Sequence, residues 1–401
     1  WATISTSRRS ARTLNPIRRI VDNLVPPKNS DKEIIPLSLG DPTVFGNLAA
    51  PPELTEAVAR HLNNGTANGY SHSAGAAASR AAIAAAYGSP AAPLTADDIF
   101  IASGCSGSLD LVMSALMDAG DNILLPRPGF PLYQASCRPA SKQNCLICRF
   151  YRLLPDRGWE ADLAHLSSLV DANTRAILVN NPSNPCGSVY SESHLRAILA
   201  VAEAHRIPVI SDEIYGSMAF GHCRGNAGGP LASLTTTVPV IATGGLAKQF
   251  VVPGWRVGWV LIHDRNGALT EVRKGIANLS QLVLGANTLV QAALPDVLCP
   301  SPGSDVERRL ARFHRRYVGL LRDNAQFTAA RLGAVPGLAV VPPQGAMYAM
   351  VSSKSFFPST VADGETFSRA LLAEESVVVL PGSCFGAPNF FRIVFSGESC
   401  F

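Results

Sequence analysis

The sequence predicts an α/β protein built from two domains, and three observations support this fold class. Short apolar segments alternate with amphipathic segments between residues 98 and 262, which is typical of parallel strands connected by helices. Polar residues follow these strands at the carboxyl ends, where open parallel sheets bind ligands. A chain of 401 residues is long enough for two domains. We expect a large domain with a mostly parallel central sheet flanked by helices, and a smaller α+β domain.

The segment CPSPGSD at residues 299–305 is the clearest linker, because proline and glycine interrupt regular structure. We therefore place an N-terminal arm and the first part of the small domain in residues 1–44. The large domain takes residues 45–299, and the C-terminal small domain takes residues 300–401.

Composition argues against several classes of function. The chain is 47% hydrophobic, but it contains no uninterrupted apolar run of the roughly eighteen residues that a membrane span needs. The net charge of +4 is small, and no basic stripe follows the N-terminus, so nucleic-acid binding has little support. Nine cysteines form no disulfide or metal framework, although Cys145 and Cys148 have the spacing of a redox motif. The odd count favours reduced thiols, and we expect a cytoplasmic protein without a metal site.

The N-terminal segment supports two readings. Several arginines and serines precede the first acidic residue, Asp22, which resembles the end of a transit peptide and would direct the protein to mitochondria. The alternative, which we favour, is an ordered arm with a short helix opened by Asn15 as N-cap and Pro16 at the first helical position. A strand from Ile34 to Leu39 then ends at Gly40, where a bare backbone N–H could face an anion.

The next segments predict an anion site. Tyr70 lies in a glycine-bounded loop, and an alanine-rich helix follows from Ala76 to Tyr87. After a strand at residues 98–103, the turn Gly104-Cys-Ser-Gly107 leads into a helix at residues 108–117. Free N–H groups and the helix dipole at such a turn favour a phosphate. No dinucleotide or nucleoside-triphosphate fingerprint accompanies the turn.

Three further strands end in candidate site residues. The strand at 122–125 precedes Phe130 and Tyr133, which could stack on a flat ring or fill the core. The strand at 174–179 precedes Asn184, whose backbone is restricted by prolines on both sides. After a helix at 192–205, the strand at 207–211 precedes Asp212 and Tyr215.

Lys248 follows another strand, at residues 238–243, and two glycines that permit close approach of a ligand. A partly desolvated lysine can act as a neutral amine and hold an aldehyde cofactor as a Schiff base. Arg256, eight residues later and before a strand at 257–262, has the forked donor geometry that fits a phosphate. A surface lysine beside a structural arginine is the alternative for this stretch alone.

Beyond the linker, a long amphipathic helix is predicted from residue 305 to Gly333, with one apolar face formed by Val306, Leu310, Phe313, Tyr317, Leu320 and Phe327. Short strands are predicted at 338–341, 347–351, 377–380 and 391–394.

Taken together, these residues form an ordered series that resembles the fold type I pyridoxal-phosphate enzymes. The motifs NNPSNPCGSVYS, DEIYG, GGLAK, VPGWRVGW and LSLGDPTVFGN are similar to those of the branch that contains the tyrosine aminotransferases. One departure is Gly245, which stands where many fold type I enzymes carry a phosphate-binding serine.

The resemblance implies a role for each residue. Lys248 would form the Schiff base and move the substrate proton, and Asp212 would pair with the pyridinium nitrogen. Tyr215 and Asn184 would bind the phenolic oxygen of pyridoxal 5′-phosphate, and Phe130 would stack on its ring. The remaining assignments are the phosphate ligands Cys105, Ser106 and Arg256, Tyr70 reaching the phosphate of a partner subunit, and Arg392 with the Gly40 N–H on the substrate carboxylate.

The implied reaction is transamination of tyrosine or a related aromatic or apolar amino acid by a homodimer with shared active sites. Residues 279–291, where the family's aspartate-specific members place an arginine, contain none, so a side-chain carboxylate would stay unpaired. A carbon–sulfur lyase or related fold type I lyase is the enzymatic alternative, because the same cofactor serves both reactions. A cofactor-binding transcription regulator would need a DNA-binding module, and the segment before Gly40 carries no such pattern.

Overall fold

The computed structural model describes residues 1, 3–7, 10–11, 13–23, 31–136, 147–221, 230–353 and 363–397. The predicted α/β class is confirmed, because one large sheet in these residues has the strand order β2-β9-β8-β7-β6-β3-β4-β5. The strands are β2 (Ile99–Ser103), β3 (Asn122–Arg127), β4 (Ile147–Leu154), β5 (Glu160–Ala161), β6 (Thr174–Asn180), β7 (Val209–Asp212), β8 (Val240–Gly245) and β9 (Val257–His263).

The direction of the strands brings the candidate residues to one edge. β4, β3, β6, β7 and β8 are parallel neighbours, whereas β9 runs antiparallel to both β8 and β2. The carboxyl ends of β2, β6, β7 and β8 therefore meet at the same side of the sheet, as the sequence predicts for a ligand site.

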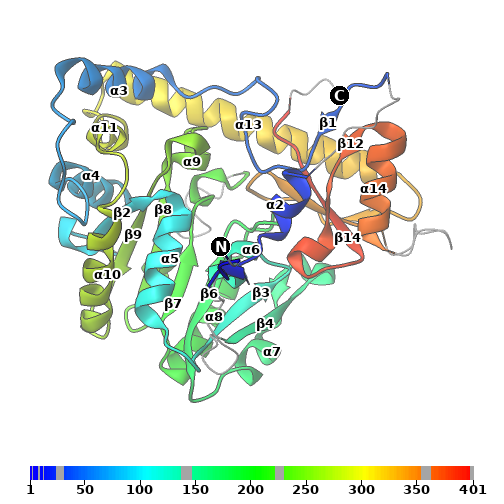
Figure 1. Ribbon diagram of the computed structural model, residues 1–401, viewed down its shortest axis with the longest axis horizontal. Helices are drawn as coiled ribbons and strands as arrows, with labels where there is room; N and C mark the ends of the chain where they lie inside the picture. Colours follow the sequence, from blue (N-terminus) through cyan, green and yellow to red (C-terminus); the bar gives the residue numbers. More distant parts are fainter. Residues whose placement is uncertain are drawn as a thin grey trace.

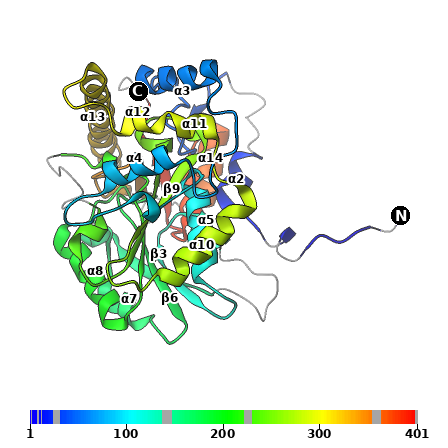
Figure 2. The same cartoon turned by 90° about the vertical axis from the view of Figure 1, so that its left-hand side faces the viewer.

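Helices cover both faces of this sheet, which explains why its central strands are continuously apolar. Figure 2 shows α5 and α10 on one face and α7 and α8 on the other. The helices of this part are α3 (Pro52–Asn64), α4 (Ala77–Tyr87), α5 (Gly104–Leu116), α6 (Pro131–Ser136), α7 (Leu163–Ser168), α8 (Glu192–His205), α9 (Leu246–Gln249), α10 (Thr270–Val283), α11 (Thr288–Ala292) and α12 (Leu294–Leu298). No helix within the described residues combines the length and apolarity that a membrane crossing requires.

The smaller part contains a four-stranded antiparallel sheet in the order β10-β11-β14-β13, within the described residues. These strands are β10 (Ala339–Val340), β11 (Tyr348–Ser352), β13 (Leu380–Pro381) and β14 (Phe390–Val394), and α14 (Gly364–Glu375) packs beside them. A separate parallel pair joins β1 (Ile35–Pro36) to β12 (Val377–Val378). This pair brings the N-terminal segment to the small sheet, and α2 (Pro16–Val21) lies between the two parts (Figure 1).

The long helix α13 (Asp305–Gly333) serves both parts and runs across the top of Figure 1. Leu310 packs into the core that contains β2 and β9, whereas Tyr317 and Leu321 pack into the core of the small sheet. Phe327 was predicted on the buried face, but it is 50% exposed. It lies toward the carboxyl end of the helix, where Arg331 covers part of its ring.

Several predicted boundaries were wrong for local reasons. The helix predicted from residue 108 begins at Gly104, because residues 104–107 form its first turn rather than a loop. The strand predicted from Ile34 to Leu39 is limited to Ile35–Pro36, and Pro36 has no N–H to continue the ladder. The strand predicted at 377–380 is divided into β12 and β13, which belong to different sheets.

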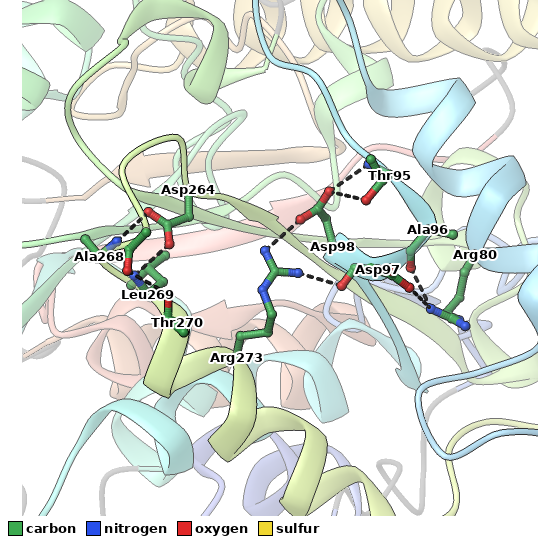
Figure 3. A network of polar contacts seen from close by, with 11 residues as sticks. Arg80, Thr95, Ala96, Asp97, Asp98, Asp264, Ala268, Leu269, Thr270 and Arg273 are labelled. Carbon is green, nitrogen blue, oxygen red and sulfur yellow. Dashed lines mark hydrogen bonds and ion pairs between the residues drawn. The ribbon is translucent and has the colours of Figure 1, made fainter.

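A polar network fixes the amino end of β2, opposite the site (Figure 3). Asp98 accepts hydrogen bonds from the Thr95 N–H and hydroxyl, both at 2.7 Å, and forms an ion pair with Arg273 of α10 at 2.6 Å. Arg80 of α4 donates to the Ala96 carbonyl at 2.7 Å. Burial alone would raise the pKa of Asp98, but hydrogen bonds from Thr95 and Arg273 lower it overall. The network holds two helices against the strand that leads into α5.

Candidate active site

A cavity of about 200 Å³ lies at the carboxyl ends of β7 and β8, beside the start of α5. The large part contributes most of the predicted residues, and β11 and β14 of the small sheet close another side. The N-terminal arm also lines the cavity, which confirms that α2 is an ordered element. The lining residues that matter below are Arg18, Gly40, Cys105, Ser106, Phe130, Tyr133, Asn184, Asp212, Tyr215, Lys248, Arg256, Tyr348 and Arg392.

Arg256 and the first turn of α5 form an anion cradle. Gly104 has a φ of +72°, and a side chain there would lie 2.5 Å from Nη2 of Arg256. Gly258 likewise passes so close to the Gly104 backbone that a side chain would collide with it. Arg256 donates to the Pro253 carbonyl at 2.9 Å and, in the described part of the chain, forms no ion pair. A helix amino terminus beside an uncompensated guanidinium is suited to a phosphate.

Gly245 shows why the serine of related enzymes is missing here. A Cβ atom at this position would lie 2.8 Å from the Val257 carbonyl oxygen and 3.0 Å from the Gly258 Cα. Because both contacts are with backbone, a serine would force β8 and β9 apart. A phosphate at this position would have α5 and Arg256 as its ligands, without a side chain from residue 245.

Asp212 is a buried carboxylate at the end of β7, only 3% exposed. Its Oδ2 accepts a hydrogen bond from the Tyr133 hydroxyl at 2.7 Å, and its Oδ1 accepts from the Ile214 N–H at 3.2 Å. The Cys105 thiol lies 3.5 Å from Oδ1. Burial raises the pKa of Asp212, and no cation pairs with it among the described residues. A protonated ring nitrogen would supply the missing positive charge.

Two neighbours of Asp212 make contacts beyond their predicted roles. The sequence predicts that Tyr133 on α6 stacks on a ring or fills the core, and in the structure its hydroxyl also holds the Asp212 carboxylate. Cys105 was predicted to help hold a phosphate at the helix start, which stays a prediction; its thiol is directed to Asp212 and to the Thr243 hydroxyl, both at 3.5 Å. Burial raises the pKa of this thiol, so it stays neutral. Phe130 lines the cavity and meets Tyr133 edge to face, with 5.6 Å between ring centres.

Lys248 lies on α9, and its Nζ donates a hydrogen bond to the carbonyl oxygen of Gly40. It pairs with no carboxylate in the described ranges. Gly40 was predicted to offer its N–H to a substrate, and the structure adds that its carbonyl faces the lysine. A side chain at Gly40 would collide with the Tyr348 hydroxyl. Position 40, where the N-terminal segment contacts Lys248, therefore requires glycine.

Arg392 on β14 is a buried cation, 1% exposed. Its Nη1 donates to Asn184 Oδ1 at 2.9 Å and its Nη2 donates to the Ser38 carbonyl at 2.6 Å, whereas Nε has no partner among the described residues. The guanidinium stacks on Tyr348, 4.4 Å from the ring centre. Burial lowers the pKa of Arg392. In the described part of the chain no carboxylate compensates this charge, which makes the site suited to a ligand carboxylate.

Tyr348 and the place of Arg18 in the cavity wall were not predicted from the sequence. Tyr348 carries a hydroxyl 2.8 Å from that of Tyr215, but it lies within an apolar strand and no local signal marked it. Arg18 of α2 lines the cavity and forms an exposed ion pair with Asp22 at 3.4 Å. Arg19, its neighbour, lines a different cavity beside α14.

Two predicted residues lie away from this site. Tyr70 is 94% exposed and does not line the cavity of its own chain, which leaves its assignment to a partner subunit as a prediction. Cys145 lies outside the described residues, so its pairing with Cys148 on β4 is untested. The described part of the chain contains no cluster of three or more His, Cys, Asp or Glu residues suited to a metal.

Comparison with known proteins gives consistent results. The sequence model of the aminotransferase class I and II family matches residues 32–399. Human tyrosine aminotransferase is 46% identical over 396 residues, which is 98% of this chain and 84% of that protein. The structure of tyrosine aminotransferase from Leishmania infantum superposes with a TM-score of 0.90 at 34% identity, covering 100% of this chain and 95% of the other. Alanine aminotransferase from Pyrococcus furiosus gives a TM-score of 0.87 at 29% identity, covering 98% and 96%.

Proposed function

Because the chain belongs to the aminotransferase class I and II family, we propose that it is a pyridoxal-5′-phosphate-dependent tyrosine aminotransferase. One observation carries this proposal. Asp212, Lys248, Arg256 and Arg392 line one cavity, and none of them forms an ion pair within the described residues. A protonated pyridine nitrogen, an aldehyde, a phosphate and a substrate carboxylate would each satisfy one of the four groups. The residues present therefore fit the cofactor together with an amino acid.

Each of the residues that line the cavity has a different role in the reaction. When bound, the cofactor supplies an electron sink for the charge left by loss of the substrate's α-proton. Asp212 holds the proton on the ring nitrogen, and the Tyr133 hydrogen bond keeps the carboxylate in place. The Lys248 amine takes up the α-proton as a general base. Arg392 grips the α-carboxylate and so orients the bond that must break.

The preference for tyrosine is supported by the character of the cavity and by the names of the relatives. Ile17, Leu39 and Phe130 line it with apolar surface, on which an aromatic side chain gains by burial. The segment 279–291 contains no arginine to hold a side-chain carboxylate. A lyase remains the alternative reaction, because the same cavity would hold the same cofactor.

We also propose a homodimer in which Tyr70 reaches the neighbouring site. Leu282 and Val283 at the end of α10 are each 77% exposed, and Tyr70 is nearly fully exposed. The two segments are adjacent, since a Cβ atom at Gly285 would lie 3.6 Å from the Ser73 carbonyl. A second copy would cover this apolar surface, and two-fold pairing is the commonest assembly. Sedimentation should show a dimer at micromolar concentration, and an active monomer would contradict the proposal.

The test of the activity is product analysis with purified protein and added cofactor. We expect tyrosine and a 2-oxo acid to give the 2-oxo acid of tyrosine and a new amino acid in equal amounts. Cysteine conjugates serve as the lyase probe: release of pyruvate, ammonia and thiol without amino transfer would favour the lyase. We propose that the protein is cytoplasmic, supported by Cys105, Cys186, Cys299 and Cys384, which form no disulfide among the described residues.

A further inference from the structure

Tyr348 contacts three parts of the cavity wall that come from distant segments. It is 1% exposed on β11, and its hydroxyl lies 2.8 Å from the hydroxyl of Tyr215, with the two rings nearly perpendicular at 88°. Its ring face carries the guanidinium of Arg392 at 4.4 Å. Its hydroxyl also occupies the space that a side chain at Gly40 would need. One side chain therefore links the arginine suited to a carboxylate with the tyrosine at the end of β7.

The hydrogen bond between the two hydroxyls has a preferred direction. Two phenols that share one hydrogen bond leave one proton for another acceptor, and within the described residues neither oxygen has a second partner. A cation against an aromatic face withdraws electron density from the ring, which makes the attached hydroxyl a better donor. By position either hydroxyl can be the donor, and the stacking of Tyr348 on Arg392 favours Tyr348 as the donor to Tyr215. The proton of Tyr215 is then directed to the cavity, which Tyr215 lines.

We propose that Tyr348 is a positioning residue that presents the hydroxyl proton of Tyr215 to the phenolic oxygen of the cofactor. This inference rests on the proposed function, because it needs the cofactor in the cavity. A hydroxyl that accepts a hydrogen bond becomes a stronger donor, since the two bonds polarise one another. Burial is the main cause that raises the pKa of Tyr215, and the neighbouring Tyr348 is the second. The Tyr215 hydroxyl therefore stays protonated and can donate a hydrogen bond.

The substitution Tyr348→Phe tests the hydroxyl alone. The ring remains on Arg392, so the KM for tyrosine should change less than about twofold. The visible absorbance of the resting, cofactor-loaded protein, titrated without substrate, should show an apparent pKa raised by about half a pH unit, roughly threefold in the equilibrium. Without the Tyr348 hydroxyl, the negative charge on the phenolic oxygen of the cofactor is stabilised less. The nitrogen that joins Lys248 to the cofactor then holds its proton more tightly, so the apparent pKa rises.

The matched control is Tyr317→Phe. Tyr317 is a buried tyrosine in the same core cluster, and its hydroxyl has no hydrogen-bond partner among the described residues. Its loss should leave the apparent pKa of the visible band unchanged. A shift in this variant as large as in Tyr348→Phe would mean that general loosening of the small-domain core, rather than the tyrosine pair, moves the titration.

A double-mutant cycle identifies the route of the effect. In a Tyr215→Phe background, Tyr348→Phe should add no further shift, because the hydroxyl through which it acts is gone. An unchanged pKa in the Tyr348→Phe single variant would overturn the proposal, and so would an equal shift in both backgrounds. Wild-type protein that shows no visible band with added cofactor would refute the proposed function instead.

Discussion

Replacement of Arg392 by lysine should separate the shape of the substrate-carboxylate site from its charge. The guanidinium uses Nη1 and Nη2 on Asn184 and Ser38, lies flat on Tyr348 and still has an unpartnered Nε. Lysine keeps the charge but loses the planar fork and at least one directed bond to a carboxylate. A hydrogen bond to a charged group contributes about 1.5–3 kcal/mol, so kcat/KM for tyrosine should fall roughly 10- to 150-fold.

The assay compares tyrosine with tyramine, which has the same ring and amine but no α-carboxylate. Arg392→Lys should lower kcat/KM for tyrosine while leaving the slow reaction of tyramine within about twofold of wild type. The visible absorbance of the bound cofactor should persist, since Asp212, Lys248 and Arg256 are unchanged. Equal losses for both amines, or a loss below about threefold for tyrosine, would refute the reasoning that Arg392 acts on the carboxylate.

Four further outcomes follow from the same structure. Lys248→Ala should abolish turnover and borohydride-stable cofactor attachment, and peptide mapping that finds the cofactor on another lysine would contradict the assignment. Asp212→Asn should lower kcat by several orders of magnitude. Because burial raises the pKa of Asp212, the charged carboxylate disfavours the folded state near neutral pH. The cofactor-free variant should therefore resist urea at least as well as the cofactor-free wild type. The value of kcat/KM should be higher for tyrosine than for aspartate. Arg18→Gln should lower kcat/KM for aspartate about threefold more than it lowers kcat/KM for tyrosine, whereas the control Arg19→Gln should leave kcat/KM for both substrates unchanged. Asp98→Asn should cost about 1 kcal/mol of unfolding free energy at pH 7, measured in urea, and the difference should vanish as pH falls below about 4 through the lowered pKa of Asp98.

Local signals were sufficient for much of the large domain. Buried parallel strands are short apolar runs, and their ends are marked by the polar residues that follow, so Asp212, Asn184 and Lys248 could be placed at one sheet edge without coordinates. The helices α8 and α13 begin and end where their patterns predict. Each of these features depends on residues that are close in sequence.

Features that depend on distant segments could not be predicted. Tyr348 meets Tyr215 across 133 positions of sequence, and Lys248 meets Gly40 across 208. The contact between Tyr133 and Asp212 could not be predicted, because a tyrosine that fills a core and one that holds a carboxylate have the same local sequence pattern. Arg18 and Arg19 are adjacent in sequence, yet they project from α2 in different directions and line different cavities. Such outcomes are decided by packing between elements rather than by propensity.

The continuous helix α13 makes the two domains mechanically inseparable. A fragment that ended at residue 299 would lose Leu310 from the core behind β2 and β9, together with Arg309, whose Nε lies 2.6 Å from the buried carboxylate of Glu53 on α3. A fragment that began there would expose the same face of the helix to water. Heat and denaturant should therefore melt both domains in a single transition, and a peptide bond cut within residues 299–305 should leave a nicked protein that stays assembled and keeps its active site.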